Sequence, residues 1–151
     1  MKKLALAMIF IGCLLLTIYC ARAVRINEIM YNPLGNDYDF EYIELYSENL
    51  SDVSNYSFDG IIFTFPENFS FEGYLVLANT NYDDGEDNDF WDRYNFSADF
   101  EFTGSLSNPG ETLVLYDANN SVIDSVSYDP GTEGYSLEYY NGEFVESLVL
   151  H

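Results

Sequence analysis

The stretch GSLSNPGETLVLYDANNSVIDSVSY, residues 104–128, decides the fold of this chain. Two apolar runs, at 112–116 and 121–128, flank the tetrapeptide Asp-Ala-Asn-Asn at 117–120. Because Asn and Asp tolerate left-handed backbone conformations, this pattern predicts two antiparallel strands joined by a short turn. The Pro-Gly pair at 109–110 predicts a second tight turn just upstream. A hairpin cannot bury its apolar face alone, so we expect further strands to cover it.

Several other segments have the composition and alternation of short strands. Turn signals separate them at intervals of about ten residues, and no long helical period occurs, which is typical of β-sandwiches. The sequence therefore predicts an all-β fold, an immunoglobulin-like antiparallel β-sandwich of about eight or nine short strands. The strands expected outside the hairpin span residues 25–31, 41–46, 61–65, 74–78, 100–102, 135–140 and 143–150, with one helical turn at 89–94.

The first 23 residues have the pattern of an export signal. Two lysines follow Met1, an apolar run covers residues 4–18, and Ala-Arg-Ala at 21–23 fits a small-x-small cleavage site. The apolar run is shorter than the roughly 20 residues that a bilayer span needs. We therefore expect a signal peptide at 1–23, a single domain at 24–151, and no transmembrane span after signal cleavage.

The charge of the expected mature chain is strongly negative. Residues 24–151 carry two arginines, no lysine and all 26 acidic residues, a formal charge of −24. Such a surface repels phosphate backbones and anionic membranes, so it excludes nucleic acid as a partner, and it attracts divalent cations. Both cysteines lie in the expected signal, so we expect no disulfide in a protein that is secreted to the extracellular space or the cell envelope.

Six motifs in this order resemble the lamin tail domain family, an immunoglobulin-like sandwich found at the end of nuclear lamins and in exported prokaryotic proteins. Individually each motif is an ordinary strand or turn, but together they cover most of residues 24–140. The motifs are INEIMYNP at 26–33, EYIELY at 41–46, GYLVLA at 73–78, GSLSNPGE at 104–111, VIDSVSY at 122–128 and GYSLE at 134–138.

The resemblance implies a non-catalytic domain. In exported prokaryotic proteins, this family is expected to act as a tether or binding unit, here for a surface protein or a glycan. The tryptophan and the Pro-Gly close that usually follow the last motif are absent, so we expect either that residues 143–150 supply the final strand or that the product is truncated. The chromatin contacts of lamins do not transfer to a chain this acidic.

The residues themselves also argue against an enzyme. The single histidine, His151, is the last residue, where we expect fraying, and the expected mature chain has no cysteine or lysine. Paired-carboxylate glycosidase chemistry remains as an alternative. Glu28, Glu44 and Asp124 each share a strand face with apolar or aromatic residues, Glu28 with Ile26 and Met30. For all three carboxylates we favour a hydrogen-bonded structural role over catalysis.

One loop has the composition of a calcium site. Residues 81–89, NYDDGEDND, place Asp, Asn and Glu oxygens around a glycine, as Ca²⁺ requires. The spacing does not match a helix-flanked calcium loop, so an acidic loop without a metal is the alternative. The expected metal ligands are Asp83, Asp87 and Asp89.

Aromatic residues beside this loop offer a recognition patch. Such a patch would stack on sugars or bind a protein, and it gives the second functional hypothesis, a Ca²⁺-dependent carbohydrate-binding module. Packing in the core is the favoured alternative for these rings. The residues of the patch are Tyr82, Phe90, Trp91 and Tyr94.

Overall fold

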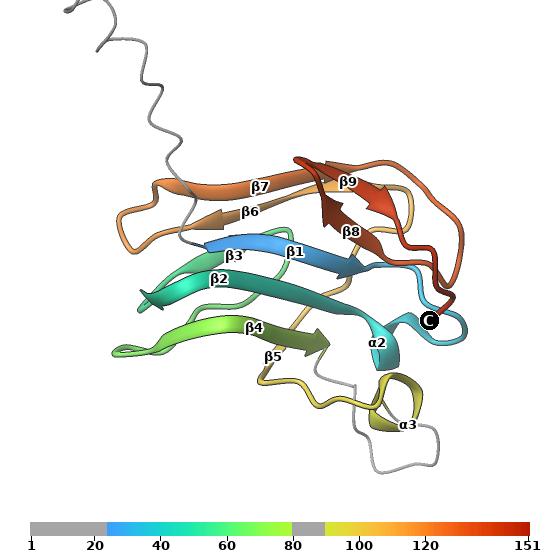
Figure 1. The fold of residues 1–151 in the computed structure, drawn as a ribbon, viewed down its shortest axis with the longest axis horizontal. Coiled ribbons are helices and arrows are strands. Elements are labelled where there is room, and N and C mark those ends of the chain that lie inside the picture. Colours follow the sequence, from blue (N-terminus) through green and yellow to red (C-terminus); the bar gives the residue numbers. More distant parts are fainter. Residues whose placement is uncertain (1–23, 80–89) are drawn as a thin grey trace, which may run out of the picture.

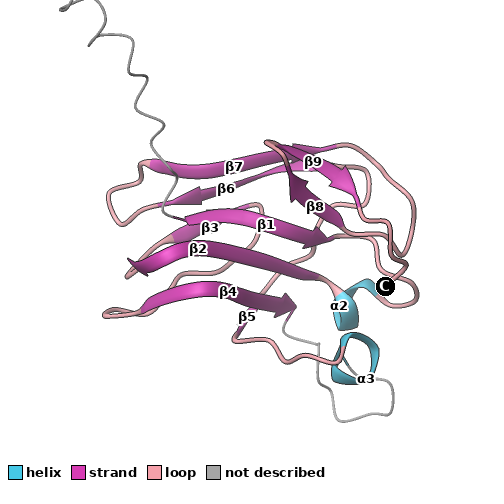
Figure 2. Cartoon of the chain, viewed as in Figure 1, coloured by secondary structure: helices cyan, strands magenta, loops and turns pink. Residues whose placement is uncertain are grey.

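The computed structural model describes residues 24–79 and 90–151, which form two β-sheets packed as layers (Figure 1). Two short helices and the connecting loops lie around the sheets (Figure 2). The elements are β1 (Val24–Met30), α2 (Asp37–Phe40), β2 (Tyr42–Asp52), β3 (Ser57–Asp59), β4 (Ser70–Asn79), α3 (Phe90–Tyr94), β5 (Phe100–Phe102), β6 (Glu111–Tyr116), β7 (Val122–Tyr128), β8 (Leu137–Tyr140) and β9 (Glu143–Glu146).

The smaller sheet contains the expected hairpin. Its strand order is β3-β6-β7, and β6 and β7 pair in antiparallel register from Glu111↔Tyr128 to Tyr116↔Val122. In the turn, Asn120 has φ of 61°, the left-handed conformation that the Asx-rich sequence predicts. Upstream, Gly110 has φ of +99°, and a Cβ at this position would lie 2.4 Å from the Tyr128 carbonyl oxygen. Both turns of the hairpin region are therefore confirmed.

The larger sheet has six strands in the order β5-β4-β2-β1-β8-β9. All its pairs are antiparallel except β4–β5, which is parallel. A parallel pair needs a long crossover, and the connection from β4 to β5, which includes α3, provides it. The two sheets and nine strands of the described residues confirm the immunoglobulin-like β-sandwich, with one parallel pair added at its edge.

The main core lies between the two sheets. Alternate residues of β1, β2 and β4 face alternate residues of β6 and β7, as the pleat requires. Burying these aliphatic and aromatic side chains is the principal favourable contribution to folding. The fully buried aliphatic members include Ile26, Ile29, Ile43, Leu45, Leu77, Leu113 and Leu115.

Two of the expected strands differ from the structure. Residues 61–65 form only isolated bridges, such as Ile62↔Thr103, and the regular strand in this region is β3 instead. The segment still hydrogen-bonds to residues 56–58, since Phe65 N–H donates to the Tyr56 carbonyl at 2.9 Å, and Phe65, which is 1% exposed, packs its ring against Phe69 and Phe100. The last expected strand, 143–150, ends at Glu146 as β9, which pairs with β8 through the Asn141-Gly142 turn.

A second, smaller core covers part of the outer face of the six-stranded sheet, the face turned away from β3, β6 and β7. Met30, Tyr42, Val76 and Ala78 of the sheet pack here against Phe90 of α3. The predicted helical turn is therefore present, and it shields this end of the sheet (Figure 1). In the part of the chain that the structure describes, no helix has the length and apolar character to cross a membrane.

Candidate functional site

A bulge in β1 decides which residues reach the outer face of the six-stranded sheet. Ile26 pairs with Leu45 of β2, but the next aligned pair is Glu28 with Glu44, so β1 carries one extra residue, Asn27. A one-residue insertion reverses the alternation of the strand. Glu28 therefore does not share a face with Ile26, as the sequence pattern predicted, although it still shares one with Met30 on the opposite side of the sheet.

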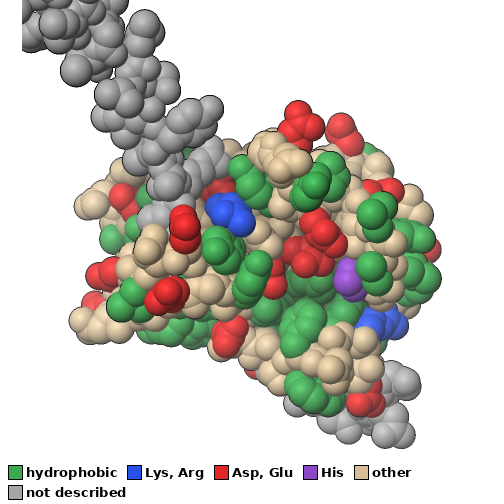
Figure 3. All heavy atoms as spheres, in the orientation of Figure 1, with side chains coloured by type: hydrophobic (Ala, Val, Ile, Leu, Met, Phe, Trp, Pro, Cys, Tyr) green, Lys and Arg blue, Asp and Glu red, His purple; other side chains and the backbone are tan. Residues whose placement is uncertain are grey.

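Three glutamates form a row across neighbouring strands of this face. Glu28 of β1 is in register with Glu44 of β2 on one side and with Glu138 of β8 on the other. We call these three residues the glutamate row. Like charges directly opposite one another destabilise a sheet, so the row requires compensation from its surroundings. Figure 3 shows acidic side chains gathered on this face beside the histidine.

One end of the glutamate row is tied to Arg25. The side-chain Nδ2 of Asn27 donates to Glu44 Oε1 at 2.7 Å, and Arg25 Nη2 donates to the side-chain Oδ1 of Asn27 at 3.1 Å. The guanidinium of Arg25 also lies 4.3 Å from the centre of the Tyr46 ring and 5.0 Å from that of Tyr139, a cation–π arrangement. Arg25 is thus held on the Glu44 side of the row.

The pKa values of Glu44 and Tyr42 are both raised by burial, and nearby negative charge adds to the rise. Burial raises the pKa of Glu44 to about 7; the Asn27 hydrogen bond opposes this rise, and the charges of Glu28 and Glu138 add to it. Tyr42 donates its hydroxyl to Glu28 Oε1 at 2.5 Å. Burial, followed by the negative charge of Glu28, raises the pKa of Tyr42, so this hydroxyl stays protonated and acts as a donor.

His151 lies beside Glu28, the middle residue of the glutamate row. Its ring nitrogen Nε2 lies 3.8 Å from Glu28 Oε1, and its ring packs 6.2 Å from that of Tyr94. The backbone N–H of His151 donates to the Gly134 carbonyl at 2.9 Å, and Ser147 Oγ lies 3.3 Å from Nε2. The expected fraying of this residue is therefore wrong, because main-chain and side-chain contacts hold it against the sheet.

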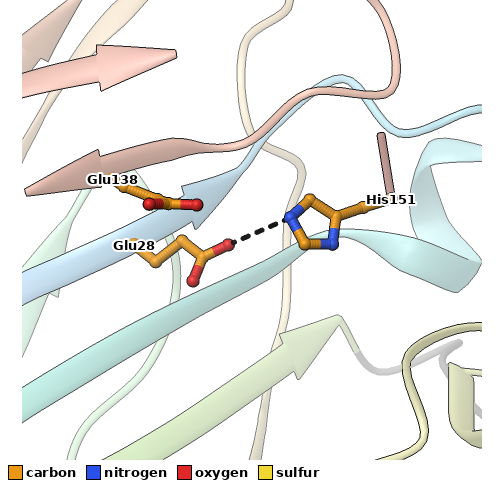
Figure 4. Close-up of side chains that lie close together, drawn as sticks. All are labelled: Glu28, Glu138 and His151. Carbon is orange, nitrogen blue, oxygen red and sulfur yellow. Dashed lines mark ion pairs between the residues drawn. The ribbon is translucent and has the colours of Figure 1, made fainter. Parts of the chain in front are cut away.

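Three potential metal-ligand atoms lie close together, one each from Glu28, Glu138 and His151. These three atoms all lie within 4.8 Å of one another, and each residue is partly buried. Figure 4 shows both carboxylates and the imidazole converging from β1, from β8 and from the segment after β9. Sequence reasoning singled out Glu28 but missed Glu138 and dismissed His151, since no local pattern reveals which strands β8 joins.

The remaining buried carboxylates are structural. Asp124 is 3% exposed and accepts the Ile26 backbone N–H at 2.9 Å, which ties β7 of one sheet to β1 of the other. This confirms the hydrogen-bonded role expected for Asp124. Glu44 and Glu28 are likewise hydrogen-bonded, to Asn27 and to the Tyr42 hydroxyl.

Glu41 is a buried acid that the sequence analysis did not single out. It is 0% exposed and accepts hydrogen bonds from Asn79 Nδ2, Ser105 Oγ and the Leu106 N–H. Burial raises its pKa to about 7, and the three hydrogen bonds oppose that rise. Glu41 therefore anchors the loop before β6 to the larger sheet.

Comparison with known families agrees with this architecture. The family model of the Lamin Tail Domain matches residues 20–130, well over half of the chain. The chain belongs to the lamin tail domain family. No curated protein and no solved structure shows significant similarity to it. The match to the lamin tail domain ends before β8, so Glu138 and His151 lie outside the matched residues.

The expected aromatic patch of this lamin tail domain is only partly on the surface. Phe90 is 1% exposed and Tyr94 is largely buried, both packed edge-on against Tyr42, so these two rings belong to the smaller core. Trp91 is 52% exposed. Tyr82 and the expected calcium ligands Asp83, Asp87 and Asp89 lie outside the described residues.

Proposed function

We propose that this lamin tail domain is an exported, non-catalytic module that binds a surface protein outside the cell or in the cell envelope. Its membership of the family supports a modular role, and the signal-like residues 1–23 support export. Carboxylate catalysis is disfavoured because the buried Glu41 and Asp124 both accept backbone N–H groups that fix the fold.

The observation that carries the proposal is an open sheet edge whose strand is followed in the chain by exposed apolar residues. β9 is the last strand of the larger sheet, so one side of it has no strand neighbour among the described residues. Just beyond it, Leu148 is 99% exposed, Val149 60% and Leu150 55%. Adjacent exposed apolar residues of this kind mark interaction sites, and an open edge offers main-chain hydrogen bonds to an added strand. A protein partner in extended conformation fits this surface.

Site-specific crosslinking in the producing cells tests the binding surface. A photoreactive amino acid at position 148 should give a discrete adduct with another protein. The matched control is position 62, because Ile62 is also an exposed apolar residue, at 74%, but lies away from β9. Adducts of equal yield from both positions, or none from position 148, would refute binding at this edge.

Export has a separate test. The mature product recovered from the medium or the envelope fraction should begin at Val24, as N-terminal mass spectrometry would detect. Recovery of the uncleaved chain from the cytoplasm alone would refute this part of the proposal.

A Ca²⁺-dependent carbohydrate-binding module is the second candidate, favoured by the half-exposed Trp91 on α3. Exposed indole rings stack on sugar faces, and α3 directly follows the acidic segment 81–89. Glycan binding that EDTA abolishes and that Trp91→Ala weakens would support this candidate. Binding that is insensitive to both treatments would reject it.

A further inference from the structure

We propose that Glu28, Glu138 and His151 bind a divalent transition metal ion of the Zn²⁺ type on the outer face of the six-stranded sheet. One imidazole nitrogen and two carboxylate oxygens form a donor set suited to such ions, whereas Ca²⁺ takes oxygen ligands alone. This site is separate from the acidic segment 81–89 and does not depend on the proposed binding surface at β9.

The separations of the donor atoms fit a shared ion. Ligands at about 2.1 Å from a tetrahedral Zn²⁺ lie about 3.4 Å from one another. Glu28 Oε1 and His151 Nε2 are 3.8 Å apart, and the three donor atoms stay within 4.8 Å. Rotamer adjustment of one glutamate closes the remaining gap, because both carboxylates are partly exposed and extend from paired strands.

The negative charge of the glutamate row is a second argument for a bound metal ion. Residues 24–151 contain two arginines and no lysine. Among the described residues, Glu28 has an ion pair with His151, and no ion pair joins either arginine to Glu28 or Glu138. Arg25 is engaged with Asn27 at the Glu44 end of the row, and Arg93 stacks on the Phe40 ring and donates to the Leu34 carbonyl. An ion at the Glu28–Glu138 pair would relieve the repulsion between these facing carboxylates.

The neighbours of the three ligands hold them in place. The Tyr42 hydroxyl donates to Glu28 Oε1, the kind of hydrogen bond that orients a ligating carboxylate. His151 is fixed by its backbone hydrogen bond to Gly134 and by contact with the Tyr94 ring. Glu138 is held by the β1–β8 register at Glu28↔Glu138. Strands β1 and β8 therefore position the two glutamates, and backbone and ring contacts position His151 in the segment after β9.

Metal titration of the purified protein, prepared without a histidine tag, tests the site. Calorimetry with Zn²⁺ and visible absorption with Co²⁺ should both report one ion per chain, the latter with the intense bands of a four-coordinate centre. Glu138→Gln and His151→Ala should each weaken Zn²⁺ affinity at least tenfold. The matched control is Glu143→Gln, which removes one charge from an exposed position on the same hairpin and should leave the affinity unchanged.

Two outcomes would overturn the proposal. The first is the absence of saturable Zn²⁺ binding by a protein that unfolds cooperatively. The second is Zn²⁺ binding that His151→Ala leaves unaltered, since this would place the ion on other acidic residues. The titration is run with excess Ca²⁺ to occupy oxygen-only sites, so the acidic segment 81–89 cannot mimic the result. Neither outcome affects the crosslinking test, and the two proposals therefore fail separately.

Discussion

Glu41 should make this domain less stable as the pH rises through neutrality. Its pKa is about 7 in the folded protein, against 4.5 for an unperturbed glutamate. Below pH 4.5 the carboxyl is protonated in both states and has no effect. As the pH rises, the unfolded chain releases the proton first, so stability is lost through the window from about 4.5 to 7.

The magnitude follows from proton linkage. With these two pKa values, Glu41 lowers the free energy of unfolding by about 0.8 kcal/mol at pH 5 and about 3.3 kcal/mol at pH 8, a fall of about 2.5 kcal/mol. This is a large part of the roughly 5–15 kcal/mol by which a domain is stable.

Glu41→Gln removes the titration and keeps the shape. The amide oxygen of glutamine still accepts from Ser105 and Leu106, but its NH₂ group faces the Asn79 donor, at a cost of about 1 kcal/mol. The variant should therefore have nearly the same stability as the parent at pH 5 and be more stable by about 2 kcal/mol at pH 8. Urea unfolding, followed by circular dichroism at pH 5, 6, 7 and 8, measures this growing difference.

The matched control for Glu41→Gln is Glu72→Gln, which removes one charge from an exposed position on β4. The control should keep the pH-dependent fall of the parent, so general charge repulsion in this acidic protein is separated from the effect of Glu41. If Glu41→Gln loses the same stability between pH 5 and 8 as the parent, the buried carboxyl is not the titrating group and the reasoning fails.

Three further predictions concern stability. Gly110→Ala should lower the free energy of unfolding by about 2 kcal/mol or more, because alanine is strained at φ of +99° and its Cβ would collide with the Tyr128 carbonyl oxygen. An unchanged midpoint of urea unfolding would contradict this. Asp124→Ala should lower the free energy of unfolding by about 2 kcal/mol, since the buried Ile26 N–H loses its acceptor. A decrease of less than about 0.5 kcal/mol would argue for another acceptor. Millimolar Ca²⁺ should raise the melting temperature relative to EDTA, and Asp83→Ala should abolish the rise; no rise in the parent would reject the calcium loop.

Local sequence features were sufficient to predict most of the fold. The Asx turn before β7, the Pro-Gly turn at 109–110 and the alternation of Ile43 and Leu45 depend on near neighbours alone. These signals are short-range because backbone preference and strand alternation act within a few residues. The inward position of Asp124 was likewise predictable, since β7 alternates regularly from Asp124 to Tyr128 and its irregularity lies before Asp124.

The candidate metal site could not be predicted in this way. The bulge at Asn27 moves Glu28 away from Ile26, and nothing in the local alternation announces it. Glu138 becomes a neighbour of Glu28 only when β8 pairs with β1, although more than 100 residues separate them. His151 reaches both through contacts with distant segments.

The sequence by itself determined most of the strands, the turns, the acidic charge and the family of this protein, because each depends on residue type and on short-range order. Only the tertiary structure decided that Glu41 is buried and that Glu28, Glu44 and Glu138 face one another. Strand order and register bring residues from opposite ends of the chain to the same point, and they are fixed by burial of the whole core rather than by any single segment.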